Sequence, residues 1–205
     1  MKTKSSHQQT VKLVQIALMS AIVVVIQLFF ASVKIGPVTI AFSIVPLVLA
    51  GICIDPYAGL IVGAVSGIVT FLQVLTSGDY FYMFLITNNP LATALICITK
   101  TAIAGWLAGI VYRAVQKATK NTTLGSILAS IICPTVNTGI FCLGMLLFFT
   151  PAFQADATFG AMSENIIYFV LIGLAGINFI IELISTVVIT PIIQNALIAA
   201  RVFKK

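Results

Sequence analysis

The sequence predicts an all-α integral membrane protein with six transmembrane helices and with both termini in the cytoplasm. Hydrophobic residues make up 60% of the 205 positions and charged residues only 8%, with a mean hydropathy of +1.15. A soluble domain carries roughly 25% charged residues. Apolar segments long enough to cross a bilayer recur along the whole chain. The basic residues cluster at positions that an even number of spans would bring to one side.

These clusters also explain the net charge of +6, which indicates membrane orientation rather than nucleic-acid binding. One cluster precedes the first apolar run, one lies in a short loop, and one closes the chain. By the positive-inside rule, all three belong on the cytoplasmic side of the membrane. Their members are Lys2, Lys4 and Lys12, then Arg113, Lys117 and Lys120, and finally Arg201, Lys204 and Lys205.

We expect one membrane domain over residues 1–205, with residues 1–10 as a polar tail that is disordered or lies at the interface. The first apolar run, from Val11 to about Phe30, is too long for a signal peptide and lacks an Ala-x-Ala cleavage site. It therefore predicts a retained helix. The other predicted spans are Val38–Ile54, Ala58–Leu75, Asn88–Tyr112, Leu124–Phe149 and Asn165–Ala200.

Five connections join these spans, and the shortest is the Asp55-Pro56-Tyr57 turn after the second span. Lys34–Pro37 predicts a short external turn, and Thr76–Thr87, which is rich in Tyr and Phe, predicts an external loop at the headgroup level. Arg113–Thr123 is the basic cytoplasmic loop, and Thr150–Glu164 contains acidic residues and no base, as expected outside. The sixth span is longer than a bilayer requires, so it should tilt, protrude or bend near Pro191.

Glycines repeat every fourth residue at two places in the predicted spans. Gly59, Gly63 and Gly67 open the third span, and Gly105 and Gly109 lie in the fourth. Small residues at this spacing let the backbones of two membrane helices approach closely. We therefore expect a helix to pack tightly against the glycine face of the third span.

Enzyme chemistry and metal binding are not indicated. The cysteines lie in apolar segments without metal-type spacing, so Cys97, Cys133 and Cys142 are interpreted as small buried residues. The only histidine, His7, lies in the polar tail. Hydrolase, zinc-protease and P-loop motifs are missing, as is a close acidic pair. We expect a protein without a cofactor, whose ATPase, if transport is ATP-driven, is another chain.

Two ionisable residues fall inside predicted spans, where a charge costs at least ~2.5–3.5 kcal/mol at a helix centre. Lys100 lies about eleven residues into the fourth span, and Glu182 lies near the middle of the sixth. One interpretation is a buried ion pair that joins the two helices. The other makes Lys100 the counter-ion of an anionic ligand. The two overlap, because a ligand carboxylate could compete for a paired lysine.

A polar cluster interrupts the apolar segment 131–149. It contains Pro134, Asn137 and Thr138, and such groups in hydrocarbon must face protein, water or a ligand. The cluster predicts part of a pocket. In the alternative, Pro134 bends the helix and Asn137 merely satisfies the freed backbone groups.

In the sixth span, Asn178 lies four residues before Glu182, so their side chains share a helix face.

The depth of the polar residues indicates the shape of the site. They lie at or above the midplane on the external side, whereas the inner halves of the spans are poorer in such groups. A pore would be lined along its whole length, so we expect a cavity that is open outside and closed below. For Asn88 the alternative is helix capping. The predicted substrate-binding residues are Gln73, Asn88, Asn89, Lys100, Asn137, Thr138, Asn178 and Glu182.

Size, span number and basic ends make the whole chain resemble the substrate-binding S component of an energy-coupling factor (ECF) transporter. Ala17-Leu-Met-Ser-Ala21 resembles the Ala-x-x-x-Ala motif with which that family packs against a transmembrane coupling subunit. The glycine ladder and the Ile-Val-Pro46 segment add to the resemblance. It implies a multi-pass protein of the bacterial plasma membrane that captures a vitamin and works with the coupling subunit and two ATPase subunits.

The segment from Pro134 to Phe141, with Asn88-Asn89-Pro90 and Lys100, looks most like the pantothenate branch of this family. The resemblance implies that Lys100 meets the ligand carboxylate and that Asn137, Thr138 and Asn178 meet its hydroxyls and amide. Folate, riboflavin and thiazole or pyrimidine precursors use the same scaffold and stay open as ligands. An autonomous small carrier or channel, or a purely structural subunit, is the alternative from another class.

Overall fold

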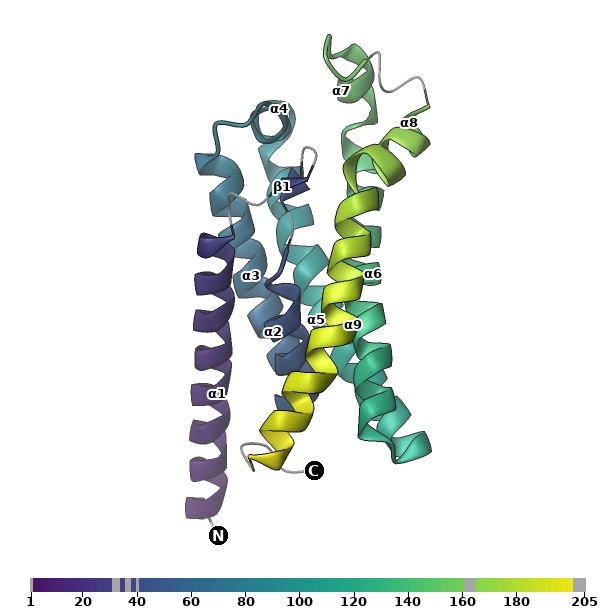
Figure 1. Ribbon diagram of the computed structural model, residues 1–205. Helices are drawn as coiled ribbons and strands as arrows, with labels where there is room; N and C mark the ends of the chain where they lie inside the picture. Colours follow the sequence, from purple (N-terminus) through teal and green to yellow (C-terminus); the bar gives the residue numbers. More distant parts are fainter. Residues whose placement is uncertain (1, 31–33, 36–37, 40, 161–164, 201–205) are drawn as a thin grey trace.

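The computed structural model describes residues 2–30, 34–35, 38–39, 41–160 and 165–200. Within these residues, five helices are long and apolar enough to cross a membrane, and they pack into one bundle (Figure 1). Three of these helices have a proline as their first residue, an asparagine cap just before it, or both, as is common at helix N-termini. The five are α1 (Lys2–Phe29), α3 (Pro56–Thr76), α5 (Pro90–Thr119), α6 (Thr122–Phe148) and α9 (Gly176–Ala199).

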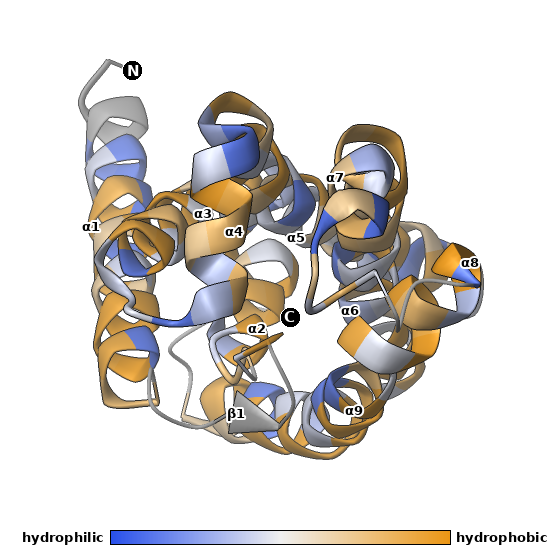
Figure 2. Ribbon diagram, turned by 90° about the horizontal axis from the view of Figure 1, so that it is seen from above, coloured by the Kyte–Doolittle hydropathy of each residue, from blue (hydrophilic) through white to orange (hydrophobic). Residues whose placement is uncertain are grey.

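The segment predicted as the second span, Val38–Ile54, has a different structure. The strands β1 (Lys34–Ile35) and β2 (Val38–Thr39) pair antiparallel, and a shorter helix follows, α2 (Ile44–Leu49), continued by the π-helix η1 (Ala50–Ile54). All of α2 is buried, and Figure 2 shows it inside the ring of long helices. A central helix is apolar on every side, so its composition resembles that of a lipid-facing span. A sixth full-length span is therefore not confirmed.

Helices also replace two predicted loops. The predicted external loop Thr76–Thr87 contains all but the last residue of α4 (Tyr80–Asn88), and the acidic loop begins with α7 (Thr150–Ala155). Most of their aromatic side chains, among them Phe84 and Phe153, pack into one buried cluster, whereas Tyr80 is exposed. This packing explains why an aromatic-rich connection is helical and partly buried.

Two helix boundaries also differ from the predictions. α5 continues to Thr119, so Arg113 and Lys117 lie on its last turns and not in a loop. α1 begins at Lys2, inside the stretch predicted as a disordered or interfacial tail. The side chains of Lys2 and Lys4, the loop residue Glu164 and the C-terminal bases Arg201, Lys204 and Lys205 lie outside the described residues.

The predicted sixth span, Asn165–Ala200, is interrupted. A short helical turn, α8 (Ile166–Tyr168), leads into the π-helix η2 (Phe169–Leu174), and α9 follows at a different angle (Figure 1). The interruption lies at Ala175, whereas α9 runs through Pro191 without a break. The extra length is therefore accommodated at the start of the segment and not near the proline.

The glycine ladder packs as predicted. A Cβ atom on Gly63 would lie 2.3 Å from the carbonyl oxygen of Thr101, and one on Gly59 would lie 2.4 Å from that of Gly105. Only glycine permits this approach of α3 to α5. The close contact is reinforced by the Thr101 hydroxyl, which donates to the Gly63 carbonyl at 2.7 Å. The expectation of tight packing on this face is confirmed.

The two ends of the bundle differ. The start of α1 and the end of α9 lie at one end, called here the terminal end, and α4, β1 and α7 lie at the other, the loop end (Figure 1). The last turns of α5, with Arg113 and Lys117, point to the terminal end. The bundle therefore carries described bases at the end where α1 begins and α9 finishes.

Candidate ligand-binding site

A cavity of about 350 Å³ lies in the half of the bundle nearer the loop end. This is within the roughly 300–1,000 Å³ of small-molecule sites. Its wall comes from α1, α3, α4, α5 and α6 and from residues 38–39 and 41–43, which we call the connector. Ser77 and Asp79, from the connection between α3 and α4, carry the wall to the loop end. Of the predicted ligand-binding residues, the wall includes Gln73, Lys100 and Asn137.

Lys100 is the cationic residue of the cavity wall. It lies ten residues into α5, roughly 15 Å from the start of that helix at 1.5 Å per residue. Its Nζ atom lies 5.2 Å from the centre of the Phe141 ring, which also lines the cavity. Among the described residues, Lys100 forms no salt bridge, so the direct ion pair with Glu182 is not formed. The lysine therefore lines the cavity without a directly bound carboxylate among these residues.

Glu182 and Asn178 instead bind the backbone of the connector. Oε1 of Glu182 accepts a hydrogen bond from the Ala41 N–H at 3.0 Å, and Nδ2 of Asn178 donates to the Val38 carbonyl at 3.0 Å. Both side chains are buried, and they stand one turn apart on α9. Neither belongs to the cavity wall, but Val38 and Ala41 do. These two predicted site residues therefore position the wall.

The connector is also bound from its other side. The Tyr82 hydroxyl accepts a hydrogen bond from the Thr39 N–H at 3.1 Å and lies 2.6 Å from the Thr39 hydroxyl. Tyr82 belongs to α4 and lines the cavity. The connector thus crosses between α9 and α4, and polar contacts from both helices hold it there.

Gln73 belongs to a polar group between α1 and α3. Its Nε2 atom donates to the Gln27 carbonyl at 2.9 Å, and the Gln27 side chain donates to the hydroxyls of Ser66 and Thr70 at 2.9 and 3.1 Å. All four residues line the cavity. Gln27, Ser66 and Thr70 were not among the predicted site residues, although Ser66, Thr70 and Gln73 share one face of α3 at helical spacing.

The remaining predicted residues differ in environment. Asn89 caps α5 by accepting the Ala92 N–H at 3.0 Å, and Asn88 donates to the Phe84 carbonyl at 2.9 Å. Neither residue belongs to the cavity wall, and neither does the half-buried Thr138. Asn137 is buried on the wall, close enough to interact with the Glu182 carboxylate.

Buried polar residues also occur in the half nearer the terminal end, so the expectation of few polar groups there is wrong. Ser126 and Ser130 of α6 and Thr190 and Gln194 of α9 are all buried. Nε2 of Gln194 donates to the Tyr112 hydroxyl at 2.7 Å. The signal was present in the sequence, because every fourth residue from position 178 to position 194 is polar.

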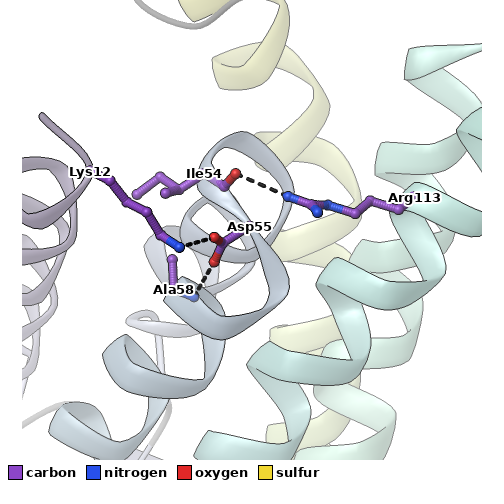
Figure 3. A network of polar contacts seen from close by, with 5 residues as sticks. All are labelled: Lys12, Ile54, Asp55, Ala58 and Arg113. Carbon is purple, nitrogen blue, oxygen red and sulfur yellow. Dashed lines mark hydrogen bonds and ion pairs between the residues drawn. The ribbon is translucent and has the colours of Figure 1, made fainter. Parts of the chain in front are cut away.

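A second polar group joins three helices toward the terminal end (Figure 3). Lys12 of α1 forms an ion pair with Asp55, whose carboxylate also accepts the Ala58 N–H at 2.7 Å, and Arg113 donates to the Ile54 carbonyl at 3.1 Å. Burial raises the pKa of Asp55, but the bonds from Lys12 and Ala58 and the charge of Arg113 outweigh it. The pKa of Asp55 is therefore below its ordinary value.

Helices long and apolar enough to cross a membrane, packed around a cavity with a cationic residue in its wall, are the architecture of a membrane protein with a small-molecule site. The chain belongs to the family of ECF transporter substrate-specific components, whose model matches residues 11–194. Members of this family are transport subunits and work with an ECF transmembrane and ATPase module. No curated protein matches the chain.

Proposed function

We propose that this protein captures a small carboxylated vitamin, with pantothenate as the best candidate, for an ATP-driven ECF importer. The main support is Lys100, because it is a cation in a cavity of ligand size and forms no salt bridge among the described residues. A ligand carboxylate would supply the missing counter-charge. Gln73 and Asn137 on the same wall would meet hydroxyl or amide groups of the ligand.

The proposed orientation has the cavity open to the outside of a bacterial plasma membrane. Arg113 and Lys117 near the terminal end support it, since basic residues favour the cytoplasmic side. Both termini would then be cytoplasmic. The cavity wall reaches the loop end, which would face outward. In this orientation the vitamin enters from outside and meets Lys100 near the middle of the bundle.

The other proposed site residues would act through the wall or through the partner. Asn178 and Glu182 would hold the connector against the ligand, and Asn88 and Asn89 would contribute from the outer mouth. Thr138 would contribute from deeper in the bundle, beside Asn137 on α6. Ala17 and Ala21 are both exposed on α1, which is the least buried of the five long helices. Their small side chains would let the coupling subunit approach, and two ATPase subunits would complete the importer.

The first experiment identifies the ligand directly. The protein is purified in mild detergent, and mass spectrometry measures the small molecules that co-purify. Calorimetry then compares pantothenate with pantothenyl alcohol, in which a hydroxymethyl group replaces the carboxylate. We expect pantothenate to bind at one molecule per chain and the alcohol to bind at least tenfold more weakly.

Two results would contradict the proposal. One is equal affinity for the acid and the alcohol, which would remove the role of the carboxylate. The other is uptake by the chain alone in liposomes that an ion-gradient uncoupler abolishes, which would indicate an autonomous carrier. Co-purification of a different vitamin would replace pantothenate and leave the capture role in place.

A further inference from the structure

The Phe141 ring is the neighbour of the Lys100 ammonium group in the cavity. The distance of 5.2 Å from Nζ to the ring centre is within the range of a cation–π interaction, which strengthens when the cation is shielded from water. Phe141 is buried, with 8% of its surface exposed, and it reaches the cavity from α6, across from Lys100 on α5. The ring is therefore placed to hold the ammonium group, and it carries no charge that would neutralise it.

The nearby Glu182 carboxylate interacts with Lys100 through space but forms no salt bridge with it. Glu182 points to the Ala41 N–H and not to Lys100. A carboxylate directly on Lys100 would cancel its charge and remove the attraction for an anionic ligand. A neutral aromatic partner avoids this, because its quadrupole attracts the cation and leaves the full positive charge for a ligand.

We propose that Phe141 is a positioning residue that determines specificity: its ring holds the Lys100 ammonium toward the cavity and so selects a ligand with a carboxylate. The inference rests on the proposed function, because it concerns the same cavity. It extends that function by assigning the preference for a negative charge to a pair of residues, a cation and an aromatic ring. A ligand of the same shape without the charge gains nothing from this pair.

The test compares variants by the ratio of their affinities for pantothenate and pantothenyl alcohol. Phe141→Leu removes the ring and keeps an apolar side chain. We expect this variant to bind pantothenate roughly three- to thirty-fold more weakly than the wild type does. Its affinity for pantothenyl alcohol should stay within about twofold of the wild-type value, so that the ratio falls. Phe141→Tyr keeps an aromatic face and should hold the ratio near that of the wild type. Circular dichroism and size-exclusion chromatography verify that each variant is folded.

A second comparison separates positioning from cavity shape. In a Lys100→Met background, Phe141→Leu should no longer change the ratio, since there is no ammonium group left to hold. If Phe141→Leu weakens the binding of pantothenate and of pantothenyl alcohol by the same factor, the ring acts only through the shape of the cavity and the inference is overturned. A lowered ratio in Phe141→Tyr would also overturn it. Wild-type protein that binds neither compound would instead count against the proposed function itself.

Discussion

The Thr186 hydroxyl of α9 donates a hydrogen bond, at 3.0 Å, to the Ser130 carbonyl of α6. Pro134 has no N–H, so the carbonyl four residues before it, that of Ser130, loses its partner within the helix. A neighbouring helix thus satisfies the group that the proline leaves free. Thr186, and not Asn137, has this role, so the alternative in which Asn137 repairs the backbone is wrong. The hydroxyl shares its single hydrogen with the carbonyl of Glu182, which also accepts from it at 2.7 Å.

The first prediction concerns this contact. Thr186→Val removes the hydroxyl at nearly constant volume and should lower the free energy of unfolding by about 1 kcal/mol, because the buried Ser130 carbonyl loses its donor. Unfolding in mixed micelles of mild detergent and dodecyl sulfate measures the change. In a Pro134→Ala background the main chain regains the missing N–H, so the same substitution should have a smaller effect. Equal losses in both backgrounds would contradict this explanation.

The second prediction concerns the α3–α5 contact. Gly63→Ala places a methyl group 2.3 Å from the Thr101 carbonyl oxygen and should destabilise the protein by about 1–3 kcal/mol, since backbone must move to relieve the clash. Gly139→Ala is the matched control: its methyl group would meet no atom within 4 Å. The control should keep or slightly raise the thermal stability, because alanine favours helices. Similar losses in the two variants would exclude close packing as the cause.

The third prediction concerns the charge of the cavity. Lys100→Met keeps an apolar chain of similar length and removes the ammonium group. A hydrogen bond to a charged group contributes roughly 1.5–3 kcal/mol, so pantothenate should bind about ten- to a hundred-fold more weakly. Binding of pantothenyl alcohol should change by about twofold or less. Calorimetry measures the affinity of the variant for both ligands. Equal losses of affinity would mean that Lys100 has a structural role.

The fourth prediction concerns pH. The lowered pKa of Asp55 means that its ion pair and hydrogen bonds favour the folded state when the carboxyl is charged. This contribution is fully present above the ordinary aspartate pKa of about 3.9 and disappears as the pH falls through the lower folded-state pKa. Melting temperatures between pH 7 and strongly acidic pH should therefore fall less in Asp55→Asn than in the wild type. An identical acid dependence would show that Asp55 does not contribute.

Much of this architecture could be predicted from residue patterns, because some residue types occur in a membrane helix only where their surroundings meet a particular need. A glycine every fourth residue from Gly59 to Gly67 indicates close helix contact wherever it occurs in a membrane span. Lys100 stood out since an intramembrane charge is rare and requires a partner. In both cases the residue type alone indicates its surroundings: a closely packed helix for the glycines and a polar or charged partner for the lysine.

The rest depends on contacts that sequence patterns do not encode. Glu182 was predicted to meet Lys100 or the ligand, but its partner is the backbone of Ala41, 141 positions away. Every residue has a backbone N–H, so nothing in the sequence marks this one. Likewise, the composition of Ile44–Ile54 is the same for a helix facing lipid and for one surrounded by protein. Only the packed structure distinguishes the two.

The last prediction separates the two sides of the connector. Glu182→Ala removes the acceptor of the Ala41 N–H, and Tyr82→Phe removes the acceptor of the Thr39 N–H. An amide that loses its hydrogen bond exchanges its hydrogen faster, since the bond must open before exchange. We expect Glu182→Ala to speed exchange mainly at Ala41, and Tyr82→Phe mainly at Thr39.

Hydrogen–deuterium exchange, resolved to single amides by fragmentation mass spectrometry or NMR, measures both sites in each variant. Glu182→Gln is the matched control: its amide oxygen can still accept the Ala41 N–H, so protection should lie between that of the wild type and that of the alanine variant. If each variant speeds exchange equally at both sites, the connector opens as one unit and the two anchors are not independent. Distinct effects would mean that α4 and α9 each hold their own part of the cavity wall.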